Sequence, residues 1–244
     1  MSLLTALRAA LLPAGLNLVA ALPVDRYDRD VPEAYRLRKR SPAARSIVVI
    51  GNGGGEFWRG FQRFCSEHPG FFDRSDPLDE YTARIVERLV APLMAGGHLT
   101  GRIVYPFQFE AEPVSFVHLG MLAGMGSRSV LGVLVHPEYG PWIALRAAIV
   151  LDDEIEPTAV IPFDPCGTCA DKACSAACPA SAVGDHGWDI PGCTAHRVER
   201  EADCTDRCHA RWHCVYGQAH RYPSDALAYH QRRARAVMRM HHGS

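Results

Sequence analysis

The chain has 244 residues, of which 48% are hydrophobic, and its formal net charge is −1. This composition suits a globular protein with one large domain, or with one domain and a small module. Acidic and basic residues are balanced, whereas phosphate binding needs a clear basic excess. We therefore expect no nucleic-acid partner, although a local basic patch is compatible with this charge.

The most apolar stretch, residues 9–22, is too short for a membrane helix, which needs roughly 20 apolar residues. One basic residue, Arg8, precedes this stretch, and Pro13, Gly15 and Asn17 interrupt it. These features favour a helix, a glycine turn and a strand over a signal peptide. We expect a cytoplasmic protein with no membrane association.

The remainder of residues 1–160 alternates between strand-like and helical patterns. Residues 46–50 predict a buried strand, and residues 79–95 carry apolar residues at helical spacing. Residues 101–109 are expected to be extended, and residues 114–124 to form a helix that ends at a glycine. Residues 129–136 and 142–151 predict two strands of a hairpin, with the turn at 137–141. The pattern indicates an α+β domain with an antiparallel core sheet.

The composition changes after residue 160. Residues 161–218 lack apolar runs, so we expect a metal centre to replace a hydrophobic core in this module. Residues 219–244 form a tail with a predicted helix that opens at Ser224 or Asp225. The arginines of this helix either dock an acidic electron-transfer partner or simply face solvent.

Eight of the nine cysteines lie between Cys166 and Cys214, and only Cys65 lies outside. In a reducing compartment such crowding indicates metal ligation. The first four follow C-x2-C-x4-C-x3-C with Pro179 directly after, which is the bacterial ferredoxin motif with two extra residues. In two-cluster ferredoxins the last cysteine of this motif ligates the other cluster. The first group comprises Cys166, Cys169, Cys174 and Cys178, and the second comprises Cys193, Cys204, Cys208 and Cys214.

Eight cysteines are the number that two [4Fe–4S] clusters need, so we hypothesise a crossed arrangement. In it, Cys214 joins the first three cysteines of the first group, and Cys178 joins the first three of the second. A single cluster remains open, because the spacing in the second group is irregular. Zinc is another alternative, since His209 and His213 flank two of the cysteines and C-x2-C pairs also bind zinc. Disulfides are a third.

These residues resemble a known group of enzymes. Residues 109–132, 142–155 and 166–183 are similar to epoxyqueuosine reductases, which resemble the core of the reductive dehalogenases. Residues 11–151 separately resemble cobalamin-processing (decyanase) proteins, above all at GVLVHPEYGPWIALRAAIVL, residues 132–151. The resemblance implies a nitroreductase-like antiparallel-sheet domain with a C-terminal ferredoxin-like iron–sulfur module. It covers nearly the whole chain.

The resemblance also implies site residues. Glu110 matches an acidic proton donor, with Tyr105 as a second donor, although Glu110 could be an ordinary surface charge. Arg146 matches an arginine that binds a thiol cosubstrate, or it pairs with an acid at a strand end. Gly132 matches a glycine close to the corrinoid, or it forms a bulge. Tyr105, Phe107 and His118, and the turn residues His136, Tyr139 and Trp142, are expected to line a cofactor cavity or to be plain core and turn residues.

The implied function is an iron–sulfur oxidoreductase that passes electrons through [4Fe–4S] clusters to a bound corrinoid, for reductive chemistry on a small molecule or on cobalamin itself. Flavin is the alternative to cobalamin. A ferredoxin or flavodoxin-like protein would donate the electrons. A ferredoxin-type carrier without a corrinoid, and a zinc-stabilised interaction module, are the rival interpretations.

Overall fold

The computed structural model describes residues 2–241, which divide into two compact units. The first unit contains residues up to 125 together with 144–162, and the second contains 126–143 together with the residues from 163 onward. The chain therefore enters the second unit, returns to the first through one strand, and leaves again. The sequence predicts one boundary near residue 160, which leaves residues 126–143 in the first domain. The structure places these residues in the second unit.

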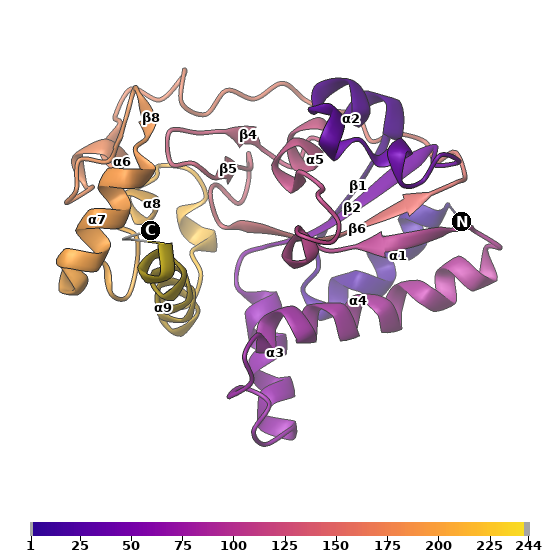
Figure 1. Cartoon of the computed structure of the whole chain (residues 1–244), viewed down its shortest axis with the longest axis horizontal. Coiled ribbons are helices and arrows are strands. Elements are labelled where there is room, and N and C mark those ends of the chain that lie inside the picture. The colour runs from indigo at the N-terminus through magenta and orange to yellow at the C-terminus, as the bar shows by residue number, and fades with distance from the viewer. Residues whose placement is uncertain (1, 242–244) are drawn as a thin grey trace. The chain divides into compact units, whose positions relative to one another are not determined.

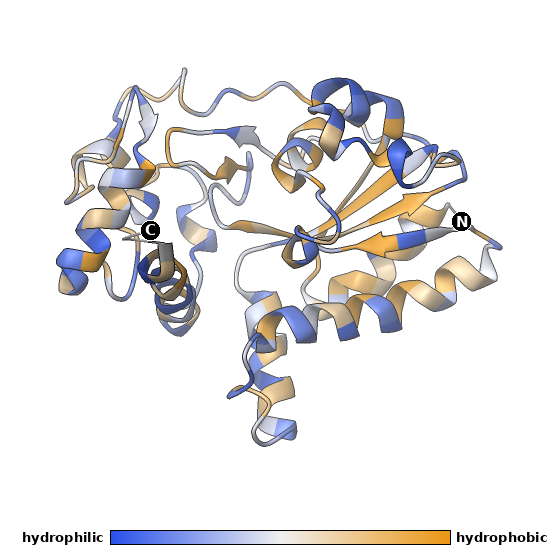
Figure 2. Ribbon diagram, in the orientation of Figure 1, coloured by the Kyte–Doolittle hydropathy of each residue, from blue (hydrophilic) through white to orange (hydrophobic). Residues whose placement is uncertain are grey.

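The first unit is built on a four-stranded sheet in the order β1 (Leu18–Pro23), β2 (Ser46–Gly53), β6 (Ile143–Leu151), β3 (Gly101–Val104). β1 pairs antiparallel with β2, and β3 pairs antiparallel with β6. Every residue of β2 is buried, which explains why the sequence there is a continuous apolar run and not an alternating one. Figure 2 shows these strands as a hydrophobic layer.

Helices cover both faces of this sheet. α1 (Leu3–Leu11) and α4 (Pro77–Gly96) lie on one face, and α2 (Val24–Asp30) and α5 (Phe116–Leu122) lie on the other (Figure 1). α3 (Glu56–Glu67) follows β2 directly. Short 3-10 turns complete the unit: η1 (Leu12–Ala14), η2 (Glu33–Tyr35), η3 (Leu37–Lys39) and η4 (Pro106–Gln108). No helix within residues 2–241 combines the length and the hydrophobicity needed to cross a membrane.

The second unit consists of short elements. They are β4 (Ser127–Arg128), β5 (Leu134–Val135), α6 (Ala173–Ala176), β7 (Val183–Gly184), β8 (Gly187–Trp188), α7 (Ile190–Glu199), η5 (Glu201–Cys204), α8 (His209–Trp212), η6 (Gln218–His220) and α9 (Ser224–His241). A buried cluster at its centre contains Leu131, Val183 and Ala210 together with two cysteines, Cys174 and Cys214. This small core agrees with the expectation that the module is poor in large apolar residues.

Most elements expected from the sequence are present. The α+β class with an antiparallel sheet is confirmed, as are the helix–turn–strand start, the buried strand at 46–50, the helices at 79–95 and 114–124, and the tail helix. Of the extended segment 101–109, only Gly101–Val104 is a strand, because Pro106 opens a 3-10 turn.

The expected hairpin between 129–136 and 142–151 is wrong. β5 pairs with β4 within the second unit, whereas β6 pairs with β3 in the first. Gly132 explains the break, since its φ of 73° and its N–H bond to the Ser129 carbonyl turn the chain inside the apolar run. The only pairing across the 137–141 turn within the described residues is a single bridge between His136 and Gly140.

Gly15 provides a test of the first unit's packing. Its φ is 77°, and a Cβ at this position would lie 2.4 Å from the Phe57 amide nitrogen. Gly15→Ala therefore adds a steric clash to the backbone cost of about 1–2 kcal/mol for a left-handed residue. Gly70→Ala is the matched control, because Gly70 has a φ of 79° and nothing within 4 Å. We expect denaturant unfolding to show a clearly larger loss for Gly15→Ala, and equal losses would contradict this packing.

Candidate metal centres

The eight clustered cysteines line two separate cavities of the second unit, four in each. The first cysteine cavity, of about 20 Å³, is lined by Cys166, Cys169, Cys174 and Cys214. The second cysteine cavity, of about 170 Å³, is lined by Cys178, Cys193, Cys204 and Cys208. Each cavity thus takes three cysteines from one sequence group and one from the other.

Electrostatics confirm that the thiols of each set are close together. Burial and the neighbouring Cys208, Cys193 and Cys178 together raise the pKa of Cys204 to about 11, although Arg197 opposes them. Burial likewise raises the pKa of Cys214, with contributions from Cys174, Cys166 and Cys169. Cys204 and Cys214 are therefore neutral thiols at pH 7, and a metal centre that binds their sulfur atoms must displace the protons.

The short helix α6 separates the cysteines of the first sequence group. Cys174 lies within α6 and faces the first cavity, whereas Cys178 follows the helix and faces the second. Lys172 caps α6 with a left-handed φ of 45°, and its Nζ donates to the Cys166 carbonyl at 3.0 Å. Asp171 and Lys172, which lie within the lengthened spacing between Cys169 and Cys174, thus lead into this helix.

The short helix α8 separates cysteines of the second sequence group in the same way, with the order of the two cavities reversed. Cys208 caps its start and faces the second cavity, and Cys214 follows its end and faces the first. α6 and α8 contact each other. Cys193 lies in α7, whose N-cap Asp189 accepts a hydrogen bond from the Gly192 N–H at 3.0 Å. The crossing of the two groups is therefore built by two adjacent one-turn helices.

The histidines near the cysteines are engaged elsewhere. His209 Nε2 lies 2.8 Å from the Asp203 carbonyl, and His213 Nδ1 lies 2.9 Å from the His209 carbonyl. Within residues 2–241, no three His, Cys, Asp or Glu side chains have the spacing for a single metal ion. The fit to a metal centre therefore rests on the donor set, four thiols around one cavity, and not on a preformed ion site.

Gly132 and Gly140 fix residues 126–143 against the cysteine segments. A Cβ on Gly132 would lie 2.2 Å from the Trp188 ring, and one on Gly140 would lie 2.2 Å from the Tyr216 carbonyl oxygen. Tyr216 lies two residues after Cys214. The resemblance places Gly132 close to a corrinoid, with a strand bulge as the alternative; in the structure Gly132 makes room for a tryptophan of the cysteine-rich unit.

The expected cavity residues around the 137–141 turn also pack within the second unit. His136 Nδ1 accepts the N–H groups of Glu138 and Tyr139 at 3.1 and 3.2 Å, and burial lowers the pKa of His136, so the ring is a neutral acceptor. Tyr139 packs against His220, with ring centroids 4.7 Å apart. Both side chains hold the turn in place.

Trp142 is 1% exposed and packs edge-on against Trp212 and Tyr222. Arg211 lies 4.7 Å over the Trp142 ring and donates to the Pro141 carbonyl at 2.6 Å. Sequence reasoning missed Arg211, which ties residues 126–143 to α8. The spacing between Arg211 and Trp142 in the sequence gives no signal of this contact.

Tyr105, Glu110 and Arg146 belong to the first unit. Tyr105 is 4% exposed, and its hydroxyl donates to Glu87 at 3.4 Å. Burial and Glu87 raise the pKa of Tyr105. Glu110 lies exposed in a turn and makes no hydrogen bond or ion pair within the described residues. Of the two expected proton donors, Glu110 is therefore the accessible one.

Arg146 lies on β6, and its Nε donates to the Oδ1 of Asn52 at 2.7 Å. Its guanidinium lies 4.7 Å from the centre of the Phe57 ring. Asn52 is buried and also bonds the Gly54 carbonyl, so Arg146 is joined to the glycine-rich turn after β2. The role of Arg146 in a thiol site and its pairing with an acid both stay predictions.

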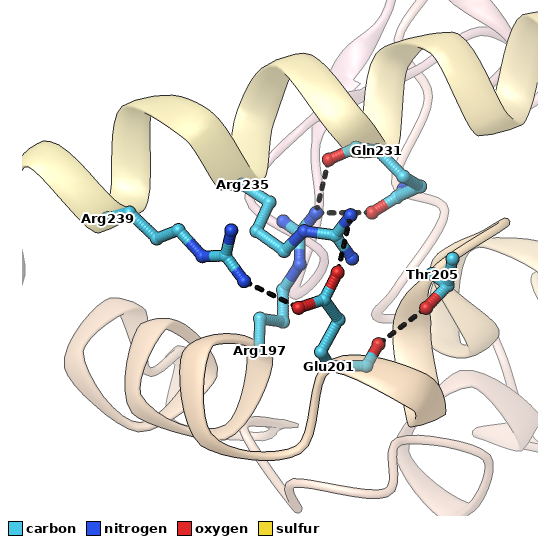
Figure 3. Close-up of polar contacts among 6 residues, drawn as sticks. All are labelled: Arg197, Glu201, Thr205, Gln231, Arg235 and Arg239. Carbon is cyan, nitrogen blue, oxygen red and sulfur yellow. Dashed lines mark hydrogen bonds and ion pairs between the residues drawn. The ribbon is translucent and has the colours of Figure 1, made fainter.

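Polar contacts that the sequence did not predict join α9 to Arg197 of α7 and Glu201 of η5, beside the second cysteine cavity (Figure 3). Glu201 accepts from Arg235 at 2.9 Å and from Arg239 at 2.5 Å. Arg197, which lines the cavity, donates to the side chain of Gln231 at 2.5 Å, and Gln231 lines the same cavity. Two arginines of the predicted basic face are thus paired internally.

No protein-family model and no curated protein matches this sequence. Solved structures with the same fold include the epoxyqueuosine reductase of Bacillus subtilis, with a TM-score of 0.62 and 14% identity over 90% of this chain and 66% of that chain. They also include the B12-trafficking protein CblC of C. elegans, with a TM-score of 0.59 and 14% identity over 94% of this chain and 90% of that chain.

A third similar structure is a reductive dehalogenase described as B12-dependent, with a TM-score of 0.53 and 15% identity over 95% of this chain and 35% of that chain. The expected resemblance to these three groups is confirmed at the level of fold. The chain spans less than two thirds of the length of the reductase and about a third of the dehalogenase. One epoxyqueuosine reductase structure is described as holding a tRNA stem loop, and the absence of a nucleic-acid partner for this chain stays a prediction.

Glu201→Gln tests the attachment of α9. The substitution keeps the shape of the side chain but removes the charge that Arg235 and Arg239 share. We expect faster amide hydrogen exchange in the last turns of α9 and around residues 197–205, with little change in the first unit. Glu199→Gln is the control, because Glu199 is exposed and its side chain makes no hydrogen bond or ion pair within the described residues. Identical exchange in both variants would show that the pairs do not hold the helix.

Proposed function

We propose that this chain is an iron–sulfur oxidoreductase of the cobalamin-dependent type, with two [4Fe–4S] clusters in its second unit. The observation that supports this most strongly is the sorting of eight thiols into two cavities of four, each mixing the two sequence groups. A zinc site is commonly built from two pairs of ligands such as C-x2-C, and this arrangement does not require Cys178 and Cys214 to lie in the cavity of the other sequence group. Two-cluster ferredoxins do require it.

The cysteines are the residues that would hold the clusters. Cys166, Cys169, Cys174 and Cys214 form one ligand set, and Cys178, Cys193, Cys204 and Cys208 form the other. A bound [4Fe–4S] cluster supplies one-electron chemistry at a potential set by net charge, hydrogen bonds and solvent exposure. Arg197 beside Cys204 contributes positive charge there, and Val183 and Trp188 limit the access of water to the second cavity. Binding displaces the thiol protons, so retention weakens as the pH falls.

The corrinoid part of the proposal is supported by the fold of the first unit, shared with proteins described as B12-trafficking and B12-dependent. We infer that this unit is nitroreductase-like and binds cobalamin, with flavin as the alternative ligand. Glu110 is the preferred proton donor, because its carboxylate is exposed and unpaired, whereas Tyr105 is buried against Glu87. Arg146 stays a proposed ligand-binding residue of this unit, and its Nε donates to the side chain of Asn52.

A complete reaction needs partners that the chain does not contain. We propose that a ferredoxin or flavodoxin-like protein donates electrons in the cytoplasm, and that the acceptor is a small molecule or cobalamin itself. In this proposal the cysteine segments are held in position by packing against four residues of the segment 126–143, namely Gly132, His136, Tyr139 and Trp142.

Cysteine variants test the crossed ligand sets. We expect a chain with Cys166, Cys169 and Cys174 replaced by Ala to keep one cluster. Adding Cys178→Ala should then lower the iron content and change the electron paramagnetic resonance of the reduced cluster, whereas adding Cys214→Ala should do neither. The reciprocal background, with Cys193, Cys204 and Cys208 replaced, should reverse the two effects. The opposite pattern in both backgrounds would mean that each sequence group holds its own cluster.

Anaerobic titration with cobalamin tests the corrinoid. We expect the visible spectrum of cobalamin to shift to the base-off form on binding, which reports that the lower base of cobalamin has left the cobalt. A brown protein that leaves the cobalamin spectrum unchanged would contradict corrinoid binding. The chain would then be tested for flavin and treated as a ferredoxin-type carrier.

A further inference from the structure

The first unit contains a cavity of about 280 Å³ that the proposed function does not use. It lies where the end of α1, with η1, meets α3 and α4. Its lining is mixed, with an apolar part that includes Pro13, Phe64, Ile85 and Leu89 and a charged part that includes Arg63 and Arg88. We call it the Tyr81 cavity, after the buried polar residue in its lining.

Tyr81 presents an unbonded hydroxyl in this cavity. Its side chain is 3% exposed, and its hydroxyl makes no hydrogen bond within the described residues. The hydroxyl faces Gly60, where an added Cβ would lie only 2.9 Å from it. Gly60 also lines the cavity, so the missing side chain leaves the hydroxyl open to a ligand. An acceptor atom of a ligand in this cavity can therefore take a hydrogen bond from the hydroxyl.

Arg63 and Arg88 add positive charge to the same cavity. Both line it, and both lie near enough to Tyr81 to lower its pKa, although burial dominates and raises it overall. The phenol is therefore a neutral donor at physiological pH. Neither guanidinium makes an ion pair or a side-chain hydrogen bond within the described residues. Glu67 is the single acid in the lining.

We propose that the Tyr81 cavity binds a small organic carboxylate with an apolar body. The Tyr81 hydroxyl and the two guanidinium groups are hydrogen-bond donors that suit a carboxylate, and guanidinium can bind it with two parallel bonds. The apolar wall suits a hydrocarbon or aromatic body and gives no advantage to a fully hydrated anion. The volume, near the lower end for ligand pockets, limits the ligand to a small molecule.

This site is independent of the iron–sulfur and corrinoid proposals, because none of its lining residues belongs to the cysteine cavities or to the expected cofactor residues. The two rim arginines are exposed, and exposed charges alone usually face solvent. The buried, unbonded Tyr81 hydroxyl behind them is what distinguishes this cavity from an ordinary charged surface.

Binding of benzoate to the full chain, measured by calorimetry and by saturation-transfer NMR, tests the proposal. We expect saturable binding that weakens with added salt, since exposed charges are screened. Tyr81→Phe keeps the aromatic packing and should weaken binding on the order of tenfold, through the loss of one hydrogen bond to a charged group. Replacing Arg63 and Arg88 together by Gln should weaken it further, and Gly60→Ala should block it.

Glu67→Gln is the matched control, because it removes the repelling charge from the same cavity and should leave benzoate binding equal or tighter. Thermal unfolding confirms that each variant is folded. The proposal is overturned if benzoate does not saturate, or if the double arginine variant binds it as well as the unsubstituted chain. It is also overturned if phosphate binds as tightly as benzoate, or if benzylamine binds in its place and Glu67→Gln abolishes that binding.

Discussion

The exchange of Cys178 and Cys214 between the two cavities is the constraint on which the second unit depends. In α6, Cys174 lies within the helix and belongs to the first set, and Cys178 follows the helix and belongs to the second. In α8, Cys208 caps the start and belongs to the second set, and Cys214 follows the end and belongs to the first. Neither set can be completed without the other segment in place. Ligand binding at either cavity therefore fixes α6 and α8 together, in a unit whose buried apolar cluster includes two of the ligand candidates.

Residues 126–143 complete that unit from a distant part of the sequence. Gly132 admits Trp188, Gly140 admits Tyr216, and Arg211 joins the Pro141 carbonyl to α8. The same segment continues directly into β6, which is one of the two central strands of the first unit's sheet. The chain therefore passes directly from the segment that packs against the cysteine-rich residues to a strand of the first unit's sheet.

The sequence predicts those parts of the fold whose signal is local. β2 follows from its continuous apolar run, α4 from its helical periodicity, and α9 from Ser224. The crossed cysteine sets follow from the proline after Cys178, which is typical of a cysteine that serves a neighbouring cluster.

The remaining features depend on residues far apart in the sequence. The run at 129–136 appears extended because its β-branched residues are visible in the sequence, whereas the Trp188 ring that requires Gly132 comes 56 positions later. His136, Tyr139 and Trp142 were expected either to line a cofactor cavity or to be core and turn residues, and no sequence pattern indicates their partners, which are turn amides, His220 and Trp212. Glu201 and Arg239, 38 positions apart, carry no local pattern at all.

Analysis of iron, acid-labile sulfide and zinc in anaerobically reconstituted protein tests the central claim most directly. Two [4Fe–4S] clusters predict about eight iron and about eight sulfide per chain, with no stoichiometric zinc. A value of about four of each would remove the second cluster and with it the reason for the crossed cysteines. Zinc without sulfide would contradict the iron–sulfur interpretation altogether.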